Sequence, residues 1–427
     1  MQRVKIAILG IGNVGTGVWK ILTMNKEQVS ARSGYDIEVA KVLVRDKKKK
    51  RNVEVPEEVL TDSFDDIIND DSIKIVVELM GGVDPAKNYM LKAIKSGKHV
   101  VTANKFALAT CGKELAEAAE EFGVKLNYEA SVAGGIPIIH GITESLTANK
   151  ILNIVGIING TTNYILTKMT LNGMEFEDAL KEAQQKGYAE ADPTSDVEGY
   201  DAMYKIGILS SLSFGGYIDV DSIYREGITS INSIDIEYAK EFGYVIKLLA
   251  IAKQNDGLVE LRVHPAMIPA THPLANVNDS FNAIFIKGNA VGDLMLYGRG
   301  AGDLPTGSAV VGDIIAILKN GLDKNVERNT FASCPLRIKD MEDTRCEYYI
   351  RVTASDTPGT LGAISNVFGG NGVSLASVIQ KGKGDVNVPL VFVTHETLEK
   401  NINKSIKEIK AMESVVSVDN LIRVENI

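Results

Sequence analysis

A single lysine follows a short acidic segment near the middle of this 427-residue chain. Residues 187–201 contain five carboxylates, and the next charged residue is Lys205. An amine among carboxylates and apolar residues can donate and accept a proton, while the carboxylates can bind a cationic substrate. The segment therefore indicates an acid–base site. The alternative is a solvated loop followed by a surface ion pair between Asp201 and Lys205.

The sequence after this acidic segment favours burial of the lysine. Residues 200–214 are apolar on nearly all sides, a pattern typical of helices inside a protein. Asp201 and Lys205 are four residues apart and therefore lie on one face. A carboxylate at ~4 Å contributes ~4 kcal/mol of attraction at an effective dielectric of ~20, which raises a lysine pKa. Desolvation lowers that pKa by up to several units. The spacing thus leaves the pKa itself undetermined.

A glycine-rich turn near the start of the chain predicts dinucleotide binding. An apolar run leads into Gly10-x-Gly12-x-x-Gly15, and a helical pattern follows. The first glycine permits the tight turn, the second lets a pyrophosphate approach, and the third lets helix and strand pack closely. The alternative is a tight turn that binds nothing. The expected cofactor contacts in this turn are Gly10, Ile11, Gly12, Asn13, Val14 and Gly15.

The surrounding pattern predicts a doubly wound parallel α/β sheet of the Rossmann type. Strands are expected at residues 38–44, 73–79, 98–103 and 125–131, with helices at 85–96 and 112–122. Ligands bind beyond the carboxyl ends of such strands. Arg45 and Asp46 follow the second strand, where an arginine accommodates the NADP phosphate and an acid favours NAD. We expect NADP, with NAD possible.

Composition excludes several other classes of protein. A net charge of −9 argues against binding to nucleic acid, which needs a basic surface. The three cysteines lack metal-ligand spacing and indicate a reducing compartment. The chain shows neither a signal-peptide pattern nor a run of 18 apolar residues. We therefore expect a cytoplasmic protein that binds no membrane.

Six segments together resemble the homoserine dehydrogenase family over essentially the whole chain. They are GIGNVG, VVTANK, YEASVAGGIPII, INGTTNYIL, GYAEADPTSDVEGYDAMYKI and YGRGAGDLPTGSAVVGDI. The resemblance implies NAD(P)H-dependent, reversible reduction of L-aspartate 4-semialdehyde to L-homoserine, within threonine, methionine and isoleucine biosynthesis. Two alternatives are another NAD(P)-dependent dehydrogenase of amino or oxo acids, and an amino-acid sensor that performs no chemistry.

The same resemblance implies roles for individual residues. Lys205 corresponds to the acid–base lysine, and Glu190, Asp201 and Lys105 correspond to groups that hold the substrate or the lysine. Further cofactor contacts are implied at Thr102, Lys105, Gly187 and Gly302. A structural monovalent cation, usually sodium, is implied at the Glu129 carboxylate and the carbonyls of Val132, Gly134 and Ile136, oxygen donors that suit such an ion.

The last 80 or so residues form a separate pattern, β-α-β-β-α-β, which is ferredoxin-like. This region resembles an ACT domain, which implies amino-acid regulation with threonine as the natural effector. The alternative is a domain that only dimerises, and we expect a homodimer or homotetramer. The expected effector positions are Asp356, Gly359, Asn371, Val373 and Ser374.

These motifs predict a domain order along the chain. Residues 1–140 form the cofactor domain, to which a return segment at about 303–320 belongs. Residues 141–320 form an α+β substrate and dimerisation domain. Residues 321–346 form a linker, and residues 347–427 form the ACT domain. From this order we expect that removing the chain after Ile338 leaves catalysis intact but abolishes the threonine response.

Overall fold

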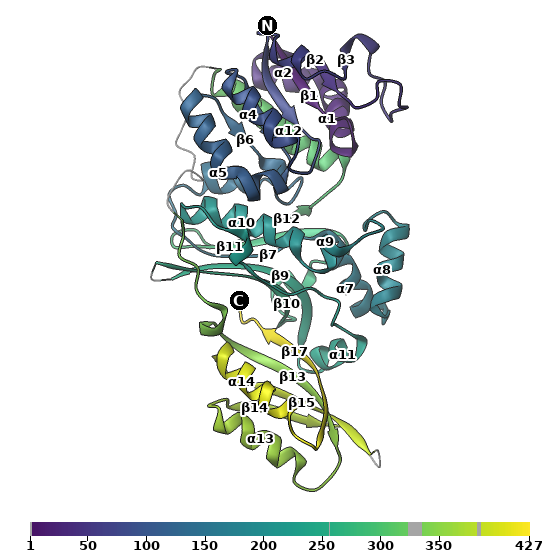
Figure 1. Ribbon diagram of the computed structural model, residues 1–427, viewed down its shortest axis with the longest axis vertical. Coiled ribbons are helices and arrows are strands. Elements are labelled where there is room, and N and C mark those ends of the chain that lie inside the picture. Colours follow the sequence, from purple (N-terminus) through teal and green to yellow (C-terminus); the bar gives the residue numbers. More distant parts are fainter. Residues whose placement is uncertain (1, 256, 323–334, 382–385) are drawn as a thin grey trace. The chain divides into compact units, whose positions relative to one another are not determined.

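The computed structural model describes residues 2–255, 257–322, 335–381 and 386–427 (Figure 1). The chain forms two compact units. Unit 1 comprises Met1–Ile158, Ala202–Ile223 and Phe281–Leu336; unit 2 comprises Asn159–Asp201, Tyr224–Ser280 and Arg337–Ile427. The middle of the sequence, expected as one domain, contributes to both units. Residues 323–334 of the expected linker lie outside the described residues.

Unit 1 contains a six-stranded sheet with the order β3-β2-β1-β4-β5-β6. Its strands are β1 (Gln2–Leu9), β2 (Tyr35–Leu43), β3 (Leu60–Thr61), β4 (Ile73–Glu78), β5 (His99–Thr102) and β6 (Leu126–Asn127). All neighbouring strands are parallel, which confirms the doubly wound fold. The prediction of a strand over 125–131 was wrong beyond Asn127. A 3₁₀ turn, Glu129–Ser131, follows because the Asp313 carboxylate accepts the backbone N–H of Glu129 and the Ser131 hydroxyl donates to Tyr128 O.

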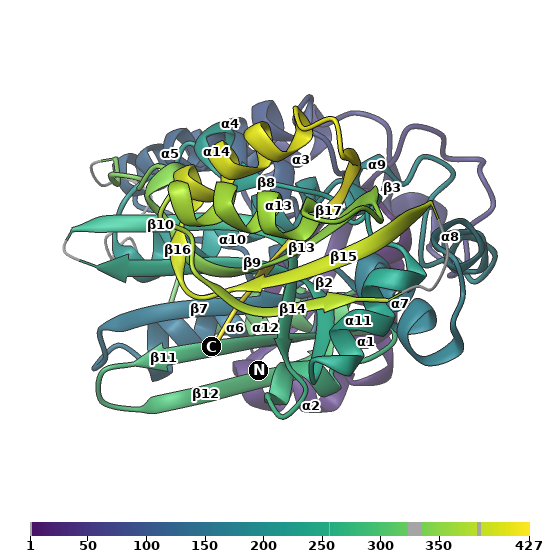
Figure 2. The ribbon, with the colours of Figure 1, turned by 90° about the horizontal axis from the view of Figure 1, so that it is seen from below.

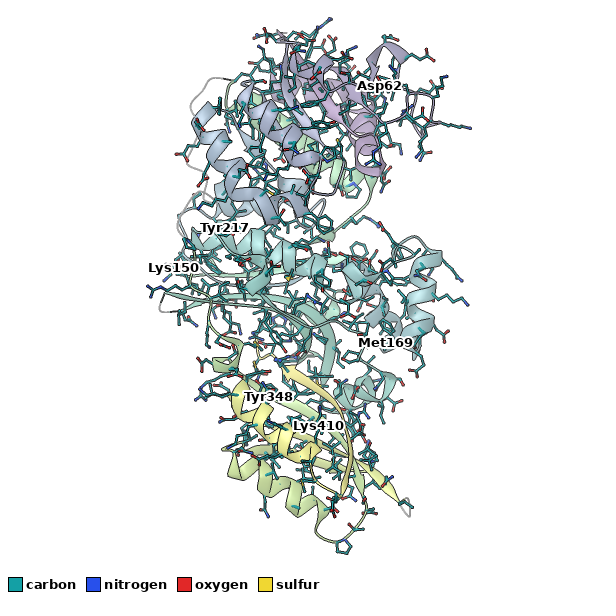
Figure 3. The ribbon with its side chains drawn as sticks, in the orientation of Figure 1. Asp62, Lys150, Met169, Tyr217, Tyr348 and Lys410 are labelled. Carbon is teal, nitrogen blue, oxygen red and sulfur yellow. The ribbon has the colours of Figure 1, made fainter. Side chains whose placement is uncertain are left out.

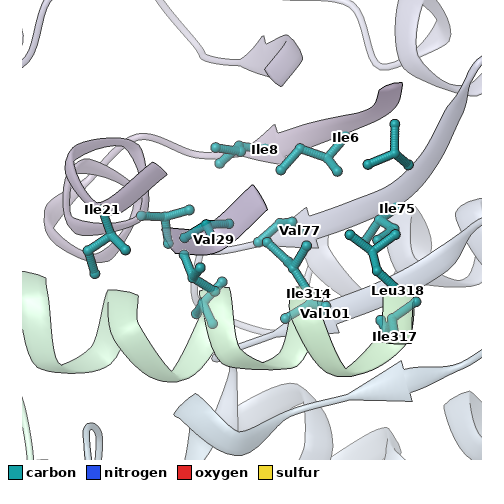
Figure 4. Packing of buried hydrophobic residues seen from close by; sticks show 14 of the residues in the cluster. Ile6, Ile8, Ile21, Val29, Ile75, Val77, Val101, Ile314, Ile317 and Leu318 are labelled. Atoms are coloured by element: carbon teal, nitrogen blue, oxygen red, sulfur yellow. The ribbon is translucent and has the colours of Figure 1, made fainter. Parts of the chain in front are cut away.

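Helices cover this sheet and complete its core. They are α1 (Asn13–Met24), α2 (Lys26–Ser33), α3 (Asp65–Ile68), α4 (Ala86–Lys95), α5 (Lys105–Phe122), α6 (Ile138–His140) and α12 (Asp303–Lys319). Helix α12 is the expected return segment: Figure 4 shows Ile314 and Ile317 among the strand residues Ile75, Val77 and Val101. Helix α5 begins seven residues before the expected start, because the Asn104 side chain accepts the backbone N–H of Ala107 and so caps it.

A close backbone contact at Gly17 joins α12 to α1, the helix that follows the glycine turn. A Cβ atom on Gly17 of α1 would lie 1.9 Å from the carbonyl oxygen of Asp303, at the first residue of α12. Helices α1 and α12 therefore touch through backbone, which explains why glycine stands there. The Lys20 ammonium donates to the Asp303 carboxylate at 2.8 Å beside this contact.

Unit 1 also holds an antiparallel sheet, with the order β12-β11-β7, and most of one long helix. These elements are β7 (Ile151–Ile157), β11 (Phe281–Gly288), β12 (Gly292–Arg299) and α10 (Tyr200–Phe214). The bounds of α10 agree with the helix that was predicted at 200–214. The first two residues of α10 count with unit 2, and the helix continues into unit 1 from Ala202.

Unit 2 is built on a sheet with the order β9-β10-β17-β13-β15-β14, with β8 beside β10 and β16 beside β13. The strands are β8 (Tyr224–Arg225), β9 (Tyr244–Asn255), β10 (Leu258–Pro269), β13 (Arg345–Ser355), β14 (Leu375–Gln380), β15 (Asn387–Thr394), β16 (Thr397–Leu398) and β17 (Val415–Val424). The helices are α7 (Gly160–Asn172), α8 (Phe176–Gln185), α9 (Thr194–Val197), α11 (Ser233–Glu241), α13 (Thr360–Gly370) and α14 (Glu399–Lys410).

The elements from β13 to β17 form the expected ferredoxin-like domain. Its helices α13 and α14 lie on one face of the sheet (Figures 1 and 2). Alternate residues of β13, including Tyr348 and Ile350, belong to the apolar core with Phe368 of α13 and Ile402 of α14. Such alternation is expected of a strand whose two faces pack differently.

The ferredoxin-like domain is not an appendage of unit 2, because it shares a sheet and a polar core with the rest of that unit. Strand β17 pairs with β10 at Ala266–Arg423 and Met267–Val424. The buried Asp235 carboxylate of α11 accepts hydrogen bonds from Arg351 at 2.8 Å, Tyr349 at 2.9 Å and Asn420 at 2.8 Å. No helix in the described ranges is long and apolar enough to cross a membrane.

Candidate active site

The glycine turn has the backbone geometry that a dinucleotide requires. Gly10 has φ +93°, and a Cβ atom on Gly15 would lie 2.4 Å from the Gly10 carbonyl oxygen. Gly12 caps the N-terminus of α1, and a Cβ atom there would meet nothing within 4 Å. A pyrophosphate can therefore approach the Gly12 backbone at the positive end of α1. Of the other predicted contacts in this turn, Asn13 is exposed, whereas Ile11 and Val14 pack against the core.

A buried carboxylate that the sequence analysis did not identify organises the ends of β4 and β5. Glu78 accepts hydrogen bonds from the Thr102 hydroxyl and the Met80 N–H, both at 2.7 Å. The Thr102 hydroxyl also accepts the Asn104 N–H at 3.0 Å. Thr102 was implied as a cofactor contact, but its buried hydroxyl already serves this network. Burial raises the pKa of Glu78, although the hydrogen bonds from Thr102 and Met80 oppose the shift.

This network also places Lys105, which the resemblance implied as a bridging residue. Asn104 donates to the Gly82 carbonyl at 2.6 Å, and Lys105 is the first residue of α5 directly after it. A glutamate that ends an apolar strand, as Glu78 does, was the signal in the sequence that could have drawn attention to this position. Arg45 is exposed beyond the carboxyl end of β2, where the ribose phosphate of NADP was expected.

Lys205 is buried, which excludes the surface ion pair as an interpretation. Its side chain lies on the second turn of α10, and the residue is 8% exposed, while Asp201 is 2% exposed. The ammonium donates to the carbonyl oxygen of Ile158 at 2.8 Å. That carbonyl lies just beyond the last residue of β7. A strand end and a helix therefore fix the amine.

The acidic segment, residues 187–201, is organised by Asn159, a residue that the sequence analysis did not single out. The Asn159 amide donates to the carboxylates of Asp196 at 2.7 Å and Asp201 at 2.8 Å. Its oxygen accepts the Thr162 N–H at 2.8 Å and so caps α7. Asn159 thus holds two carboxylates of the acidic segment near the start of α10.

The remaining predicted positions differ in exposure and place. Glu190 is exposed, and Gln184 donates to its carbonyl oxygen at 3.0 Å. Gly187 has φ +75° and follows α8 in unit 2, whereas Gly302 has φ +118° and caps α12 in unit 1. Both glycines adopt backbone conformations that other residues rarely adopt. Backbone geometry alone therefore explains why glycine occupies these two positions, whether or not either one contacts the cofactor.

The Glu129 region forms a buried charged cluster with α6 and α12. The Glu129 carboxylate accepts the N–H groups of Ile139 at 2.9 Å and His140 at 2.6 Å. The buried Asp313 carboxylate lies 2.9 Å from Nε2 of His140. This carboxylate is the main reason that the pKa of His140 is raised to about 9, against desolvation. Burial raises the pKa of Glu129.

His140 should make stability depend on pH above neutrality. Because the pKa of His140 is about 9 in the folded chain and 6.5 ordinarily, the folded state binds its proton more tightly. The resulting stabilisation is fully present below pH 6.5 and is lost as the pH rises to about 9. We expect a loss of about 1–2 kcal/mol after solvent screening. Urea unfolding across this range would show it, and His140→Asn should remove the slope; an unchanged slope in that variant would contradict it.

The predicted effector positions lie around the first turn and the helix of the ferredoxin-like domain. Asp356 accepts a hydrogen bond from Gln380 at 3.0 Å, and Gly359 caps α13 with φ +96°. Asn371 donates to Glu408 at 3.2 Å, and the Ser374 carbonyl accepts the His395 N–H. Val373 is 3% exposed, and its side chain belongs to the domain core.

Three family models match the chain in succession. The NAD-binding domain of homoserine dehydrogenase matches residues 10–129, homoserine dehydrogenase matches 137–315, and the ACT domain matches 348–414. Homoserine dehydrogenase of Synechocystis sp. is 45% identical over 435 residues, covering 99% of this chain and 100% of that protein. The Bacillus subtilis enzyme is 41% identical, covering 100% of this chain and 99% of its own.

Solved structures agree with these matches. The crystal structure of a homoserine dehydrogenase from Thiobacillus denitrificans has a TM-score of 0.93 at 41% identity, covering 100% of this chain and 99% of that chain. A hyperthermophilic archaeal homoserine dehydrogenase in complex with NADPH has a TM-score of 0.62 at 28% identity, covering 74% of this chain and 97% of its own.

The parallel sheet with its glycine turn, together with the family matches, identifies an oxidoreductase with a dinucleotide-binding domain. Its C-terminal ferredoxin-like domain is an ACT domain and is called so below. The chain belongs to the homoserine dehydrogenase family, as identity above 40% over its full length shows.

Proposed function

We propose that this enzyme catalyses the reversible NAD(P)H-dependent reduction of L-aspartate 4-semialdehyde to L-homoserine, with Lys205 as the acid–base group. The observation that carries the proposal is the burial of Lys205 on α10, one turn after a buried carboxylate of the acidic segment. The bound nicotinamide supplies hydride to the aldehyde carbon. The product would serve threonine, methionine and isoleucine biosynthesis.

In this mechanism Lys205 moves the proton. As the carbonyl is reduced, Nζ of Lys205 gives a proton to the aldehyde oxygen, and in the reverse direction it removes that proton. The Ile158 carbonyl, 2.8 Å from Nζ, orients the amine. Because the proton is transferred as the carbonyl is reduced, the oxygen becomes a hydroxyl and does not accumulate the negative charge of an alkoxide. This lowers the energy of the transition state and so accelerates the reaction.

The carboxylates of the acidic segment supply substrate recognition. The substrate carries an ammonium group, and carboxylates bind such a group through charge-assisted hydrogen bonds. Asp201 is held by Asn159, and Glu190 is exposed and accessible to a ligand. We assign substrate binding to these two carboxylates, together with Lys105 at the start of α5.

An assay of NADPH consumption tests the reaction directly. We expect turnover with aspartate 4-semialdehyde and little turnover with other amino or oxo aldehydes and ketones. Preference for another substrate would favour a different dehydrogenase of amino or oxo acids. Nucleotide binding without turnover on any of these substrates would favour the non-catalytic sensor.

We propose NADP as the preferred cofactor, with Arg45 contacting its phosphate. Support comes from the exposed position of Arg45 after β2 and from the related archaeal enzyme that was solved with NADPH. Arg45→Ala should weaken NADPH binding by about 1.5–3 kcal/mol, the value of a hydrogen bond to a charged group, and leave NADH nearly unchanged. Fluorescence titration with both nucleotides measures this, and equal weakening would mean that Arg45 does not bind the phosphate.

We propose that a monovalent cation, sodium by family resemblance, binds at Glu129 and the carbonyls of Val132, Gly134 and Ile136. The donor set fits such an ion because all four groups are oxygens and Glu129 is buried. Two of these donors also accept backbone hydrogen bonds: Glu129 from α6, and the Ile136 carbonyl from Ile138 at 2.8 Å. The ion would neutralise part of this buried acidic cluster.

Exchange of the cation tests this site. Replacing sodium with tetramethylammonium, which is too large for a carbonyl-lined site, should lower the melting temperature and the activity together. Glu129→Gln should abolish the difference between the two salts. A melting temperature that does not respond to the salt in the unaltered enzyme would argue against the site.

We further propose that the ACT domain binds threonine and that the enzyme is a cytoplasmic homodimer or homotetramer. Support comes from the ACT match and from the exposed Asp356 beside the left-handed Gly359 at the start of α13. Calorimetric titration with threonine, with Asp356→Ala as the altered protein, tests the binding. Analytical ultracentrifugation with and without threonine measures the oligomeric state.

A further inference from the structure

Arg423 of β17 connects the ACT domain to the strand β8 of unit 2. The residue is 1% exposed, and its guanidinium donates to Glu399 of α14 and to Glu226, each at 3.0 Å. It also donates to the Tyr224 hydroxyl at 2.8 Å. On the ACT side the Tyr348 hydroxyl donates to the same Glu399 carboxylate at 2.6 Å; Figure 3 shows Tyr348 in this domain. A buried arginine shared by two carboxylates fixes both segments.

The segment that Arg423 fixes lies directly against the acidic segment. Cζ of Arg225 lies 3.6 Å from the centroid of the Tyr200 ring, and its guanidinium donates to the Glu198 carbonyl. A Cβ atom on Gly227 would lie 2.4 Å from the Val197 carbonyl oxygen. Residues 225–228 and 197–200 are therefore in backbone contact, and Arg225 adds the stacked, planar contact that lysine cannot reproduce.

These contacts hold the part of the acidic segment that is not held by Asn159. Asn159 binds Asp196 and Asp201, while residues 197–200 between them contact residues 225–228. The backbone N–H of Glu226 donates to Val263 of β10 at 2.7 Å, so the supporting segment is itself fixed to the sheet of unit 2. The position of Asp201 thus depends on contacts that begin in the ACT domain.

We propose that Arg225 is a positioning residue for the substrate-binding carboxylates, and that the contact between Glu226 and Arg423 makes the ACT domain a support of the substrate site. The inference rests on the proposed role of Asp201 in substrate binding. A segment that is held in its binding geometry before the substrate arrives binds more tightly, because less ordering is required at binding. Loosening it raises KM for the substrate and leaves the cofactor site in unit 1 unchanged.

The test compares Arg225→Met and Glu226→Gln in the full-length enzyme. We expect Arg225→Met to raise KM for aspartate 4-semialdehyde about tenfold, equivalent to about 1.4 kcal/mol, with unchanged KM for NADPH. Glu226→Gln should raise KM for aspartate 4-semialdehyde by a smaller factor. Arg225→Lys should raise this KM about as much as Arg225→Met does, because lysine cannot stack on the Tyr200 ring as arginine does. Hydrogen–deuterium exchange should accelerate in peptides that cover residues 188–201.

Glu241→Gln is the matched control. Glu241 of α11 accepts from Lys381 at 2.5 Å, so this variant also removes one carboxylate charge that contacts the ACT domain, but away from the acidic segment. We expect no change in KM or in exchange at residues 188–201. The proposal would be overturned if Glu241→Gln also raised KM for aspartate 4-semialdehyde and accelerated exchange at residues 188–201. It would also be overturned if Arg225→Met left this KM unchanged. Failure of the proposed reaction itself would show instead as no NADPH consumption with aspartate 4-semialdehyde in the unaltered enzyme.

Discussion

Lys205→Ala is expected to lower kcat by roughly 10²–10⁴-fold, the range that general acid–base catalysis contributes. In the part of α10 that follows Asp201, Lys205 is the charged residue. Its Nζ is held by a hydrogen bond to the Ile158 carbonyl. Because the dinucleotide turn lies on separate elements, NADPH affinity should stay within a factor of about two. Steady-state kinetics and fluorescence titration measure the two quantities in the same preparation.

Two further variants separate chemistry from structural damage in this experiment. Lys205→Arg keeps the positive charge but holds its proton too tightly to exchange it, so turnover should stay low. Added methylamine should partly restore turnover in Lys205→Ala and not in Lys205→Arg. Lys186→Ala, which removes an exposed lysine paired with Glu182, is the control and should be fully active. Retained turnover in Lys205→Ala would refute the assigned mechanism.

Removal of the chain after Ile338 is expected to prevent unit 2 from folding, contrary to the expectation from the domain order. Strand β10 would lose β17, and Asp235 would lose Arg351, Tyr349 and Asn420. A buried charge left without partners costs about 3–5 kcal/mol. The whole stability of a domain is about 5–15 kcal/mol. Soluble yield and circular dichroism of the shortened chain measure the outcome.

A further substitution in the shortened chain can identify why unit 2 fails to fold. Arg262, which is fully buried, would lose the carboxylate of Glu425 and keep that of Glu260. Adding Asp235→Leu should recover part of the folded protein, because an apolar replacement removes the buried charge that is left without partners. The archaeal relative spans 74% of this chain, so the family fold exists at shorter length and the dependence lies in these particular residues. A folded, active shortened chain without this substitution would contradict the prediction.

The sequence was sufficient for features that depend on local spacing. Gly10, Gly12 and Gly15 predicted the dinucleotide turn because each glycine has its own steric reason within six residues. Lys205 was identifiable because a charge on an otherwise apolar helix is rare. The β-α-β-β-α-β order followed from alternating apolar runs and helical patterns, and the structure confirms it.

Features that depend on partners distant in the sequence could not be predicted. Glu78 binds Thr102, and Asn159 binds Asp201, through hydrogen bonds that span 24 and 42 residues. Asp235 is an unremarkable helical carboxylate until the fold places Arg351 beside it. The hydrogen-bond network that holds the Thr102 side chain and the core that holds the Val373 side chain depend on such distant partners too.

Because α10 is continuous from Tyr200 to Phe214, it acts as a rigid spacer. Asp201 at its start and Lys205 four residues later are separated by about 6 Å of helix rise. A change that displaces the start of α10 would therefore displace the Asp201 carboxylate and the Lys205 amine together.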